Sequence, residues 1–257
     1  MYVIINYKVK EINQQKQKRG KKMEQKIDKR KVYGIILDTE TANTIIEEDG
    51  KLEMAFVLPY DFGFAVIDSK GNTYEKHSYV NEDIFCDEYT LMQSAYYADK
   101  IPDYIRDLAH GNRQLKTTFE IRKILCDLIE KYDCQFVMAH NARFDYRACN
   151  NIQRWTTKSK YRYFFPYGIE IWDTLKMARD VLSKKPTYID FCFENGFVTK
   201  HKTPQPQYTA EVIYRFITQN IDFVEEHKGL EDVEIETEIF KYLVRQHKPM
   251  RKKLFED

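Results

Sequence analysis

Acidic and imidazole side chains gather at three points of the sequence, each beside a predicted strand end or helix start. The first point is Asp38-Thr39-Glu40-Thr41, which follows the apolar run Tyr33–Leu37. Side chains alternate along a strand, so Asp38 and Glu40 are expected to project from the same face. Two carboxylates so close together repel each other and stay ionised only when a cation lies between them. The tetrapeptide therefore predicts a cation site, although alone it also fits a strand that ends in a polar turn.

The second and third points have the same character. His140-Asn141-Ala142-Arg143-Phe144-Asp145 follows the apolar run Phe136–Ala139, and Asp145 falls in the first turn of the next predicted helix, where the helix dipole favours an anion. His227-Lys228-Gly229-Leu230-Glu231-Asp232 stands at the start of the last predicted helix. Taken alone, Asp145 fits a helix-start acid, Asp232 a solvated acid and His227 a loop histidine. Taken together, the three segments place four carboxylates and one imidazole where α/β sheets gather functional side chains.

The donor set indicates a particular metal and a particular reaction. Hard oxygen ligands suit Mg²⁺ or Mn²⁺, whereas Zn²⁺ favours cysteine and several histidines. Two such ions held ~3.5–4 Å apart clamp a phosphodiester, one generating hydroxide and the other stabilising the leaving oxygen. The candidate residues for this chemistry are Asp38, Glu40, Asp145, Asp232 and His227.

The segments D-T-E-T, H-N-x-x-F-D and H-x-x-x-x-D resemble the three exonuclease motifs of the DEDD superfamily, which has a ribonuclease H-like fold. Because His and not Tyr precedes the final Asp, the resemblance is to the DEDDh branch, which includes proofreading subunits of the DnaQ type, ribonuclease T and oligoribonuclease. It covers about Tyr33 to Val244. The resemblance implies that Asp38, Glu40, Asp145 and Asp232 ligate two metal ions and that His227 is the general base. It also implies 3′ to 5′ hydrolysis with release of nucleoside 5′-monophosphates.

Two departures from the family pattern stand out. Twenty residues separate Thr41 from Phe62, including Glu47-Glu48-Asp49-Gly50, and this connection is longer than usual. The family contacts the terminal nucleotide just after the first motif, so the sequence leaves those contacts unassigned. Gly229 stands where family members often have Ala, and we expect this exchange between small residues to change nothing.

The remaining pattern predicts the frame around these motifs. Strands are expected at residues 33–37, 62–67, 73–80, 136–139 and 169–172, and helices at 117–129, 142–153, 186–194, 208–223 and 230–246. Thr117 and Glu120 form a capping box, and Asp173 is placed to cap a helix that follows the last strand. Strands alternating with helices, together with one hairpin, predict an α/β ribonuclease H-like fold, with three layers and a mixed five-stranded sheet flanked by helices. One domain over residues 32–250 is expected.

Basic and acidic residues are unevenly distributed along the chain. Residues 1–31 hold eleven Lys or Arg against three Asp or Glu, which leaves 30 basic and 37 acidic residues in the remainder. An acidic body is a poor non-specific DNA binder and is expected if several carboxylates hold cations. The basic segment is interpreted as a disordered leader, and Met23 as the true start of translation; the alternative is a basic arm that binds DNA.

Cysteine usage and hydropathy bear on the compartment. The five cysteines include no C-x-x-C pair, which indicates reduced thiols that fill the core. No apolar run approaches the ~20 residues needed to span a bilayer, and no signal-peptide core is recognisable. We therefore expect a cytoplasmic protein with no membrane partner.

The leading functional hypothesis is a 3′–5′ exonuclease that acts on single-stranded DNA ends in replication proofreading or end trimming. A proofreading role implies a DNA polymerase or replisome partner. An RNA exonuclease of the ribonuclease T or oligoribonuclease type stays open, as does a non-catalytic interaction module on the same fold. Tyr161-Arg162-Tyr163-Phe164-Phe165 interleaves a cation with rings and fits either a base-stacking segment or a loop at the edge of the core.

Overall fold

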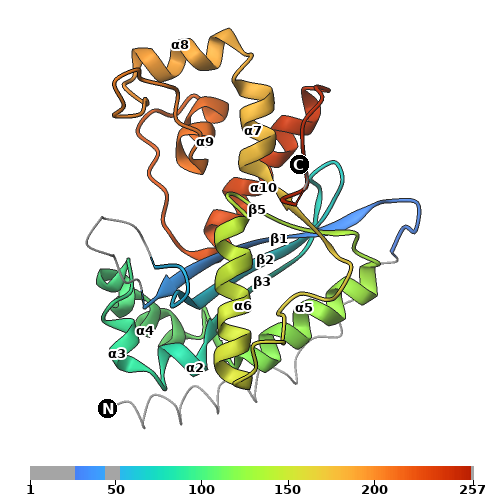
Figure 1. The fold of residues 1–257 in the computed structure, drawn as a ribbon, viewed down its shortest axis with the longest axis vertical. Helices are drawn as coiled ribbons and strands as arrows, with labels where there is room; N and C mark the ends of the chain where they lie inside the picture. Colours follow the sequence, from blue (N-terminus) through green and yellow to red (C-terminus); the bar gives the residue numbers. More distant parts are fainter. Residues whose placement is uncertain (1–26, 44–52, 256–257) are drawn as a thin grey trace.

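The computed structural model describes residues 27–43 and 53–255, and its ribbon is drawn in Figure 1. Six strands are present in this part of the chain: β1 (Tyr33–Ala42), β2 (Leu58–Asp68), β3 (Thr73–Asn81), β4 (Gln114–Lys116), β5 (Phe136–Ala139) and β6 (Glu170–Asp173). The helices of the first half are α2 (Glu82–Phe85), α3 (Tyr89–Met92), the short 3₁₀ helix η1 (Ala98–Lys100), α4 (Ile101–His110) and α5 (Thr118–Tyr132). Those of the second half are α6 (Arg143–Thr157), α7 (Thr174–Leu182), α8 (Pro186–Glu194), α9 (Ala210–Thr218) and α10 (Gly229–Arg245).

The strands form one mixed sheet in the order β4-β3-β2-β1-β5-β6. β1, β2 and β3 pair antiparallel, whereas β5 lies parallel to β1, β6 parallel to β5 and β4 parallel to β3. The sheet has one strand more than expected, because the three residues of β4 are too few to give a recognisable period. In the central pair, Asp38 lies opposite Gly63 and Glu40 opposite Asp61.

Helices cover both faces of the sheet. On one face Ile35 and Leu37 belong to a core with α5, α6 and the helices between β3 and β4. On the other face Ile36 belongs to a second core with α7, α8, α9 and α10. Figure 1 shows the two groups of helices on opposite sides of the sheet, so the layers are helix, sheet and helix. By strand alternation Asp38 and Glu40 project on the same side as Ile36, toward α10.

Local signals in the sequence set the boundaries of several helices. Thr117 and Glu120 make the predicted capping box at the start of α5, and the Asp173 side chain accepts a hydrogen bond from the Leu175 N–H at the start of α7. α8 occupies the expected residues with proline in its first turn. α9 is shorter than predicted, because Thr209 caps its start and Gln219 adopts a left-handed conformation that ends it.

The sequence pattern predicts no helix between β3 and β4, yet this segment contains α2, α3, η1 and α4. α4 carries the apolar positions Ile101, Tyr104, Ile105 and Leu108, which have helical spacing, and it ends at Gly111 with a φ of 71°. We call residues 82–113 the helical insertion.

Asp61 on β2 connects the helical insertion to α10. Its carboxylate accepts hydrogen bonds from the Tyr104 hydroxyl at 2.7 Å, from Arg113 Nη1 at 2.9 Å and from the Gly229 N–H at 3.1 Å. The side chains of Asp61 and Arg113 are 0% and 4% exposed. Arg113 also donates to Glu231 at 2.9 Å. These contacts join β2, the insertion and the first turn of α10.

Gly229 has a steric role that the sequence reading did not foresee. A Cβ atom at residue 229 would lie 2.6 Å from the Gly63 backbone nitrogen, and one at residue 63 would lie 2.0 Å from the Gly229 carbonyl carbon. The expectation that alanine at 229 changes nothing is therefore wrong here. Two glycines let α10 begin directly against β2.

Packed residues extend beyond the expected domain bounds of 32–250. Ile27 packs on the first core, and Leu254 is buried with its N–H bonded to the Ile171 carbonyl on β6. Most of the predicted leader, including Met23, and the Glu47–Gly50 segment lie outside the described residues. Among the described residues no helix is long and apolar enough to cross a membrane.

We expect Asp61→Asn to lower the free energy of unfolding by about 3 kcal/mol, because it leaves the Arg113 charge buried without its main partner. Urea denaturation followed by circular dichroism measures this. Lys123→Ala, which breaks the exposed Lys123–Asp127 pair, is the control and should cost less than about 1 kcal/mol. Equal losses of unfolding free energy in the two variants would contradict the role given to Asp61. So would a double variant Asp61→Asn/Arg113→Met whose loss of unfolding free energy equals the sum of the losses in its two single variants.

Candidate active site

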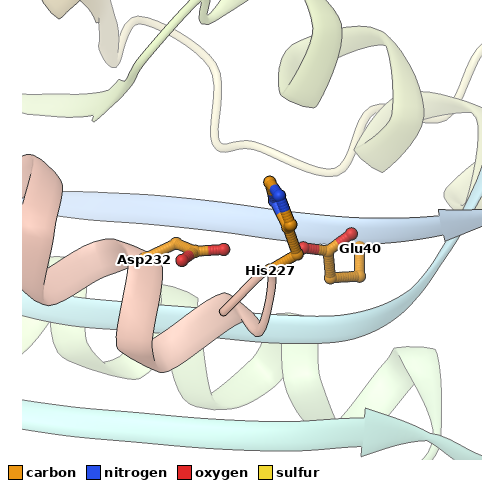
Figure 2. Close-up of side chains that lie close together, drawn as sticks. All are labelled: Glu40, His227 and Asp232. Carbon is orange, nitrogen blue, oxygen red and sulfur yellow. The ribbon is translucent and has the colours of Figure 1, made fainter. Parts of the chain in front are cut away.

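A cleft of about 680 Å³ lies at the end of β1 where the three sequence motifs meet. Its wall includes all five candidate residues, which come from β1, the start of α6, the loop before α10 and the first turn of α10. The ligand atoms of Glu40, His227 and Asp232 lie within 4.8 Å of one another. Figure 2 shows these three side chains side by side, although Glu40 lies at least 187 positions before the other two in the sequence. The fold thus brings the predicted residues together.

Asp145 of α6 adds the fourth candidate carboxylate to the cleft. It is buried in the first turn of α6, and its Oδ1 accepts a hydrogen bond of 2.8 Å from the Thr39 hydroxyl. The Thr39 side chain thereby fixes Asp145 beside Asp38 and Glu40. Thr39 belongs to the first motif, but the sequence reading gave it no role.

The carboxylates strongly perturb one another. Burial and the charges of Glu236, Asp145, Glu40 and Asp232 raise the pKa of Asp38 well above its ordinary value. Burial and the Asp232 charge raise the pKa of Glu40 to about 9, and burial raises that of Asp145 to about 7. For Asp232, burial and the Glu225 charge raise the pKa to about 8. Protons alone would thus neutralise much of the group near neutral pH.

The group also has the donor atoms that a divalent cation needs. Oδ1 of Asp232 is buried and has no hydrogen-bond partner among the described residues. An acceptor-only oxygen left unpaired in this way costs free energy, and a cation would satisfy it. Clustered carboxylates with no thiolate among them suit Mg²⁺ or Mn²⁺.

His227 stands at the rim of this group in a defined environment. Its ring stacks on Tyr97 of the helical insertion, with centroids 4.3 Å apart, and its Nδ1 lies 4.0 Å from Oε2 of Glu225. Burial and the nearby Lys100 charge lower the pKa of His227. The imidazole is therefore neutral at pH 7 and able to accept a proton.

His140 of the second motif has a structural role. It is buried, its Nε2 lies 2.7 Å from the Tyr208 carbonyl and its Nδ1 lies 3.0 Å from the Thr174 hydroxyl. Burial lowers the pKa of His140, so the neutral ring donates from Nε2 and accepts at Nδ1. These bonds join the end of β5 to α7 and to the start of α9.

Three residues at the cleft were missed by the sequence reading. Glu236 is a buried carboxylate one turn beyond Asp232, and both its oxygens accept from the His140 N–H, at 3.1 and 3.2 Å. Burial and the Asp145 charge raise its pKa well above the ordinary value. The i, i+4 spacing from Asp232 places Glu236 on the same helix face and was a readable signal. Tyr97 and Glu225 carried no such signal, because only the tertiary fold brings them beside His227.

Comparison with solved structures identifies the fold. A full-length 3′-exonuclease superimposes with a TM-score of 0.56 at 14% identity, over 86% of this chain and 85% of that one. A 3′-exonuclease solved for its 3′-end-specific recognition of a histone mRNA stem-loop gives 0.52 at 14% identity, over 86% and 85%. Exonuclease I of E. coli, in complex with a 5cy-dT13 oligonucleotide, gives 0.53 at 15% identity; there the match covers 85% of this chain but 41% of that one.

No family model matches the chain, and no curated protein is similar to it in sequence. At this level of identity the comparison establishes the fold, and the α/β, ribonuclease H-like architecture expected from the sequence is confirmed. The roles of individual residues are inferred from the geometry of the cleft.

We expect the metal-free protein to lose stability as pH rises from about 4 to about 9. Acids whose pKa is raised on folding stabilise the folded state only while they are protonated. The pKa of Asp232, for example, rises from 3.8 to about 8. Thermal unfolding in EDTA at pH 6 and 8.5 measures the effect. We expect a drop of about 4–8 °C, corresponding to about 2 kcal/mol in a domain of this size.

Adding Mg²⁺ or Mn²⁺ should remove most of that drop, and Asp232→Asn should reduce it. Asp222→Asn, which removes an exposed acid that does not line the cleft, is the control. A melting temperature of the wild type that does not depend on pH in EDTA would contradict the proposed coupling.

Proposed function

We propose that this protein is a metal-dependent 3′–5′ exonuclease that hydrolyses phosphodiester bonds at the 3′ ends of single-stranded DNA and releases nucleoside 5′-monophosphates. The observation that carries the proposal is the convergence of Asp38, Glu40, Asp145 and Asp232 with a neutral His227 in one cleft. The fold is shared with solved 3′-exonucleases, which supports the same reaction class.

Asp38, Glu40, Asp145 and Asp232 would hold two divalent cations. When bound, such ions supply a water of lowered pKa and neutralise charge on the phosphate. The chain contributes oxygens positioned in advance: Thr39 orients Asp145, and the His140 N–H orients Glu236 behind the group.

His227 is proposed to take the proton of the attacking water. Stacking on Tyr97 fixes the plane of the ring, and Oε2 of Glu225 lies 4.0 Å from Nδ1. The proton gives the ring a positive charge, which the Glu225 carboxylate then stabilises. A lowered His227 pKa keeps the ring neutral before the reaction, so that one ring nitrogen can accept a proton.

The cleft also accommodates a nucleotide. Beyond the carboxylates it is lined by Arg179 and by the aromatic side chains Tyr96, Tyr97, Phe144 and Tyr208. Tyr96 is 70% exposed, so a ring face is available at the mouth. A terminal nucleotide needs a cation beside its phosphate and an aromatic ring against its base, and Arg179 and these aromatic side chains provide such groups.

An RNA substrate is the second candidate. It is favoured by the 3′-exonuclease that recognises a histone mRNA stem-loop, because that structure matches this chain over 85% of its own length. Parallel assays in Mg²⁺ with 5′-labelled single-stranded DNA, a duplex with a 3′ mismatch, and single-stranded RNA separate the candidates. Preferential removal of the mismatched end would support proofreading with a polymerase partner. A protein that cleaves none of the three would be an interaction module.

We expect Asp38→Ala and Asp232→Asn each to abolish cleavage while the fold is retained. Each variant removes a proposed metal ligand and also relieves repulsion in the metal-free cleft. Product release is measured in Mg²⁺, with folding followed by circular dichroism and Asp222→Asn as the control. Retention of more than about a few per cent of wild-type activity would count against the metal assignment.

We expect His227→Ala to reduce the rate by about 10²–10⁴-fold, the usual contribution of general acid–base catalysis. The defect should shrink as pH rises, because bulk hydroxide partly replaces the lost base. The measurement is kcat from pH 6 to 9. An unchanged rate at pH 7 would remove His227 from the mechanism.

A further inference from the structure

A second cleft, of about 780 Å³, runs along α6 next to the active-site cleft. One wall is a face of α6, formed by residues spaced three or four apart: Arg147, Asn151, Arg154, Trp155 and Lys158. The other wall is the segment that leads into β2. Asn151 Nδ2 donates to the Met54 and Val57 carbonyls at 2.7 and 3.1 Å and so holds the two walls together. We call this cleft the α6 groove.

The groove is basic. Arg147, Arg154 and Lys158 line it, and none of them forms an ion pair with a carboxylate within residues 27–43 and 53–255. Glu53 is the acidic side chain among the described lining residues, and its carboxylate accepts from the Ala55 N–H at 3.0 Å. The Nε–H of Arg154 is buried and has no acceptor in the described part of the chain. A buried donor without a partner favours an incoming acceptor.

Aromatic rings alternate with these cations. Trp155 is 38% exposed and Phe56 on the facing wall is 51% exposed. Lys158 lies over the Trp155 ring at 4.5 Å, and Arg154 lies over Tyr163 at 5.4 Å. Cations that follow a backbone, combined with exposed ring faces, form the usual binding surface for unpaired nucleic acid.

The groove continues from the active-site cleft. Thr41 and Phe144 line the cleft, whereas Asn43 and Arg147, two and three residues further on, line the groove. From Arg147 to Lys158, α6 rises about 16 Å, which matches about three to five phosphates of one strand. A chain whose 3′ end is at Asp145 would therefore lead into the groove.

We propose that the α6 groove binds the phosphodiester backbone and bases of the single strand upstream of the terminal nucleotide, with Arg147, Arg154 and Lys158 on phosphates and Trp155 against a base. This inference rests on the proposed function and adds a second binding site to it. It predicts that affinity increases with strand length until about five nucleotides are bound.

The test compares two full-length triple variants. The groove variant is Arg147→Gln/Arg154→Gln/Lys158→Gln. The control variant, Lys70→Gln/Arg245→Gln/Lys248→Gln, removes the same charge from exposed residues that line neither cleft. Fluorescence anisotropy in EDTA measures Kd for labelled dT12 and rU12 from 0.05 to 0.5 M salt, and circular dichroism verifies folding.

We expect the groove variant to bind about 10- to 100-fold more weakly than the control variant at 0.1 M salt. The slope of log K against log salt should be shallower by about 2 in the groove variant than in the control variant. The reason is that the groove variant loses three proposed phosphate contacts, each of which contributes about 0.7 to the slope. The oligonucleotide with the larger loss identifies DNA or RNA as the preferred strand. Binding should also quench tryptophan fluorescence in the wild type but not in Trp155→Phe, because the other tryptophan, Trp172, is buried.

Equal affinities and equal salt slopes for the two triple variants, with both strands, would overturn the groove assignment. The proposed function is tested separately by wild-type hydrolysis of thymidine 5′-monophosphate p-nitrophenyl ester in Mn²⁺, a substrate too short to reach the groove. Failure of that hydrolysis would contradict the exonuclease proposal and leave the result for the groove unaffected.

Discussion

The buried carboxylate of Asp61 is the contact on which the geometry of the active-site cleft depends. It holds Tyr104 and Arg113 of the helical insertion and the first N–H of α10, and it lies opposite Glu40 in the β1–β2 pair. Because His227 and Asp232 flank the start of α10, their distance from Glu40 is set through this residue. The close contact of Gly63 with Gly229 is the steric counterpart of the same constraint, since α10 reaches Asp61 only where neither position has a Cβ.

This arrangement concentrates negative charge. Asp38, Glu40, Asp145, Asp232 and Glu236 lie in one cleft, where burial raises the pKa of each and the charges of neighbouring carboxylates raise it further. Lys100 of the insertion is a nearby cation, and it lowers the pKa of His227 as well as that of Glu40. Added positive charge, from protons or from bound cations, offsets this repulsion.

The helical insertion and the α6 groove give the cleft its surroundings. The insertion supplies Tyr97 to the His227 ring and Tyr96 to the mouth, while α6 presents Asp145 in its first turn and basic residues further along. One helix thus contributes a proposed metal ligand and a proposed path for the strand. The aromatic segment Tyr161–Phe165 divides along similar lines: Phe164 and Phe165 enter the core, whereas Tyr163 is exposed next to Arg154.

By itself the sequence determined the α/β class, the caps of α5 and α7 and the five candidate residues, because these depend on local periods, local hydrogen bonds and motifs with fixed spacing. Glu236 stands four residues after Asp232, a helical spacing that the prediction did not use. No helix was predicted within residues 82–113, although α4 shows a helical apolar pattern. The tertiary structure decided which residues surround His227, why Gly229 has no side chain and how β4 extends the sheet to six strands. Those features rest on contacts between residues tens to hundreds of positions apart, and a pattern within one segment carries no information about its distant neighbours.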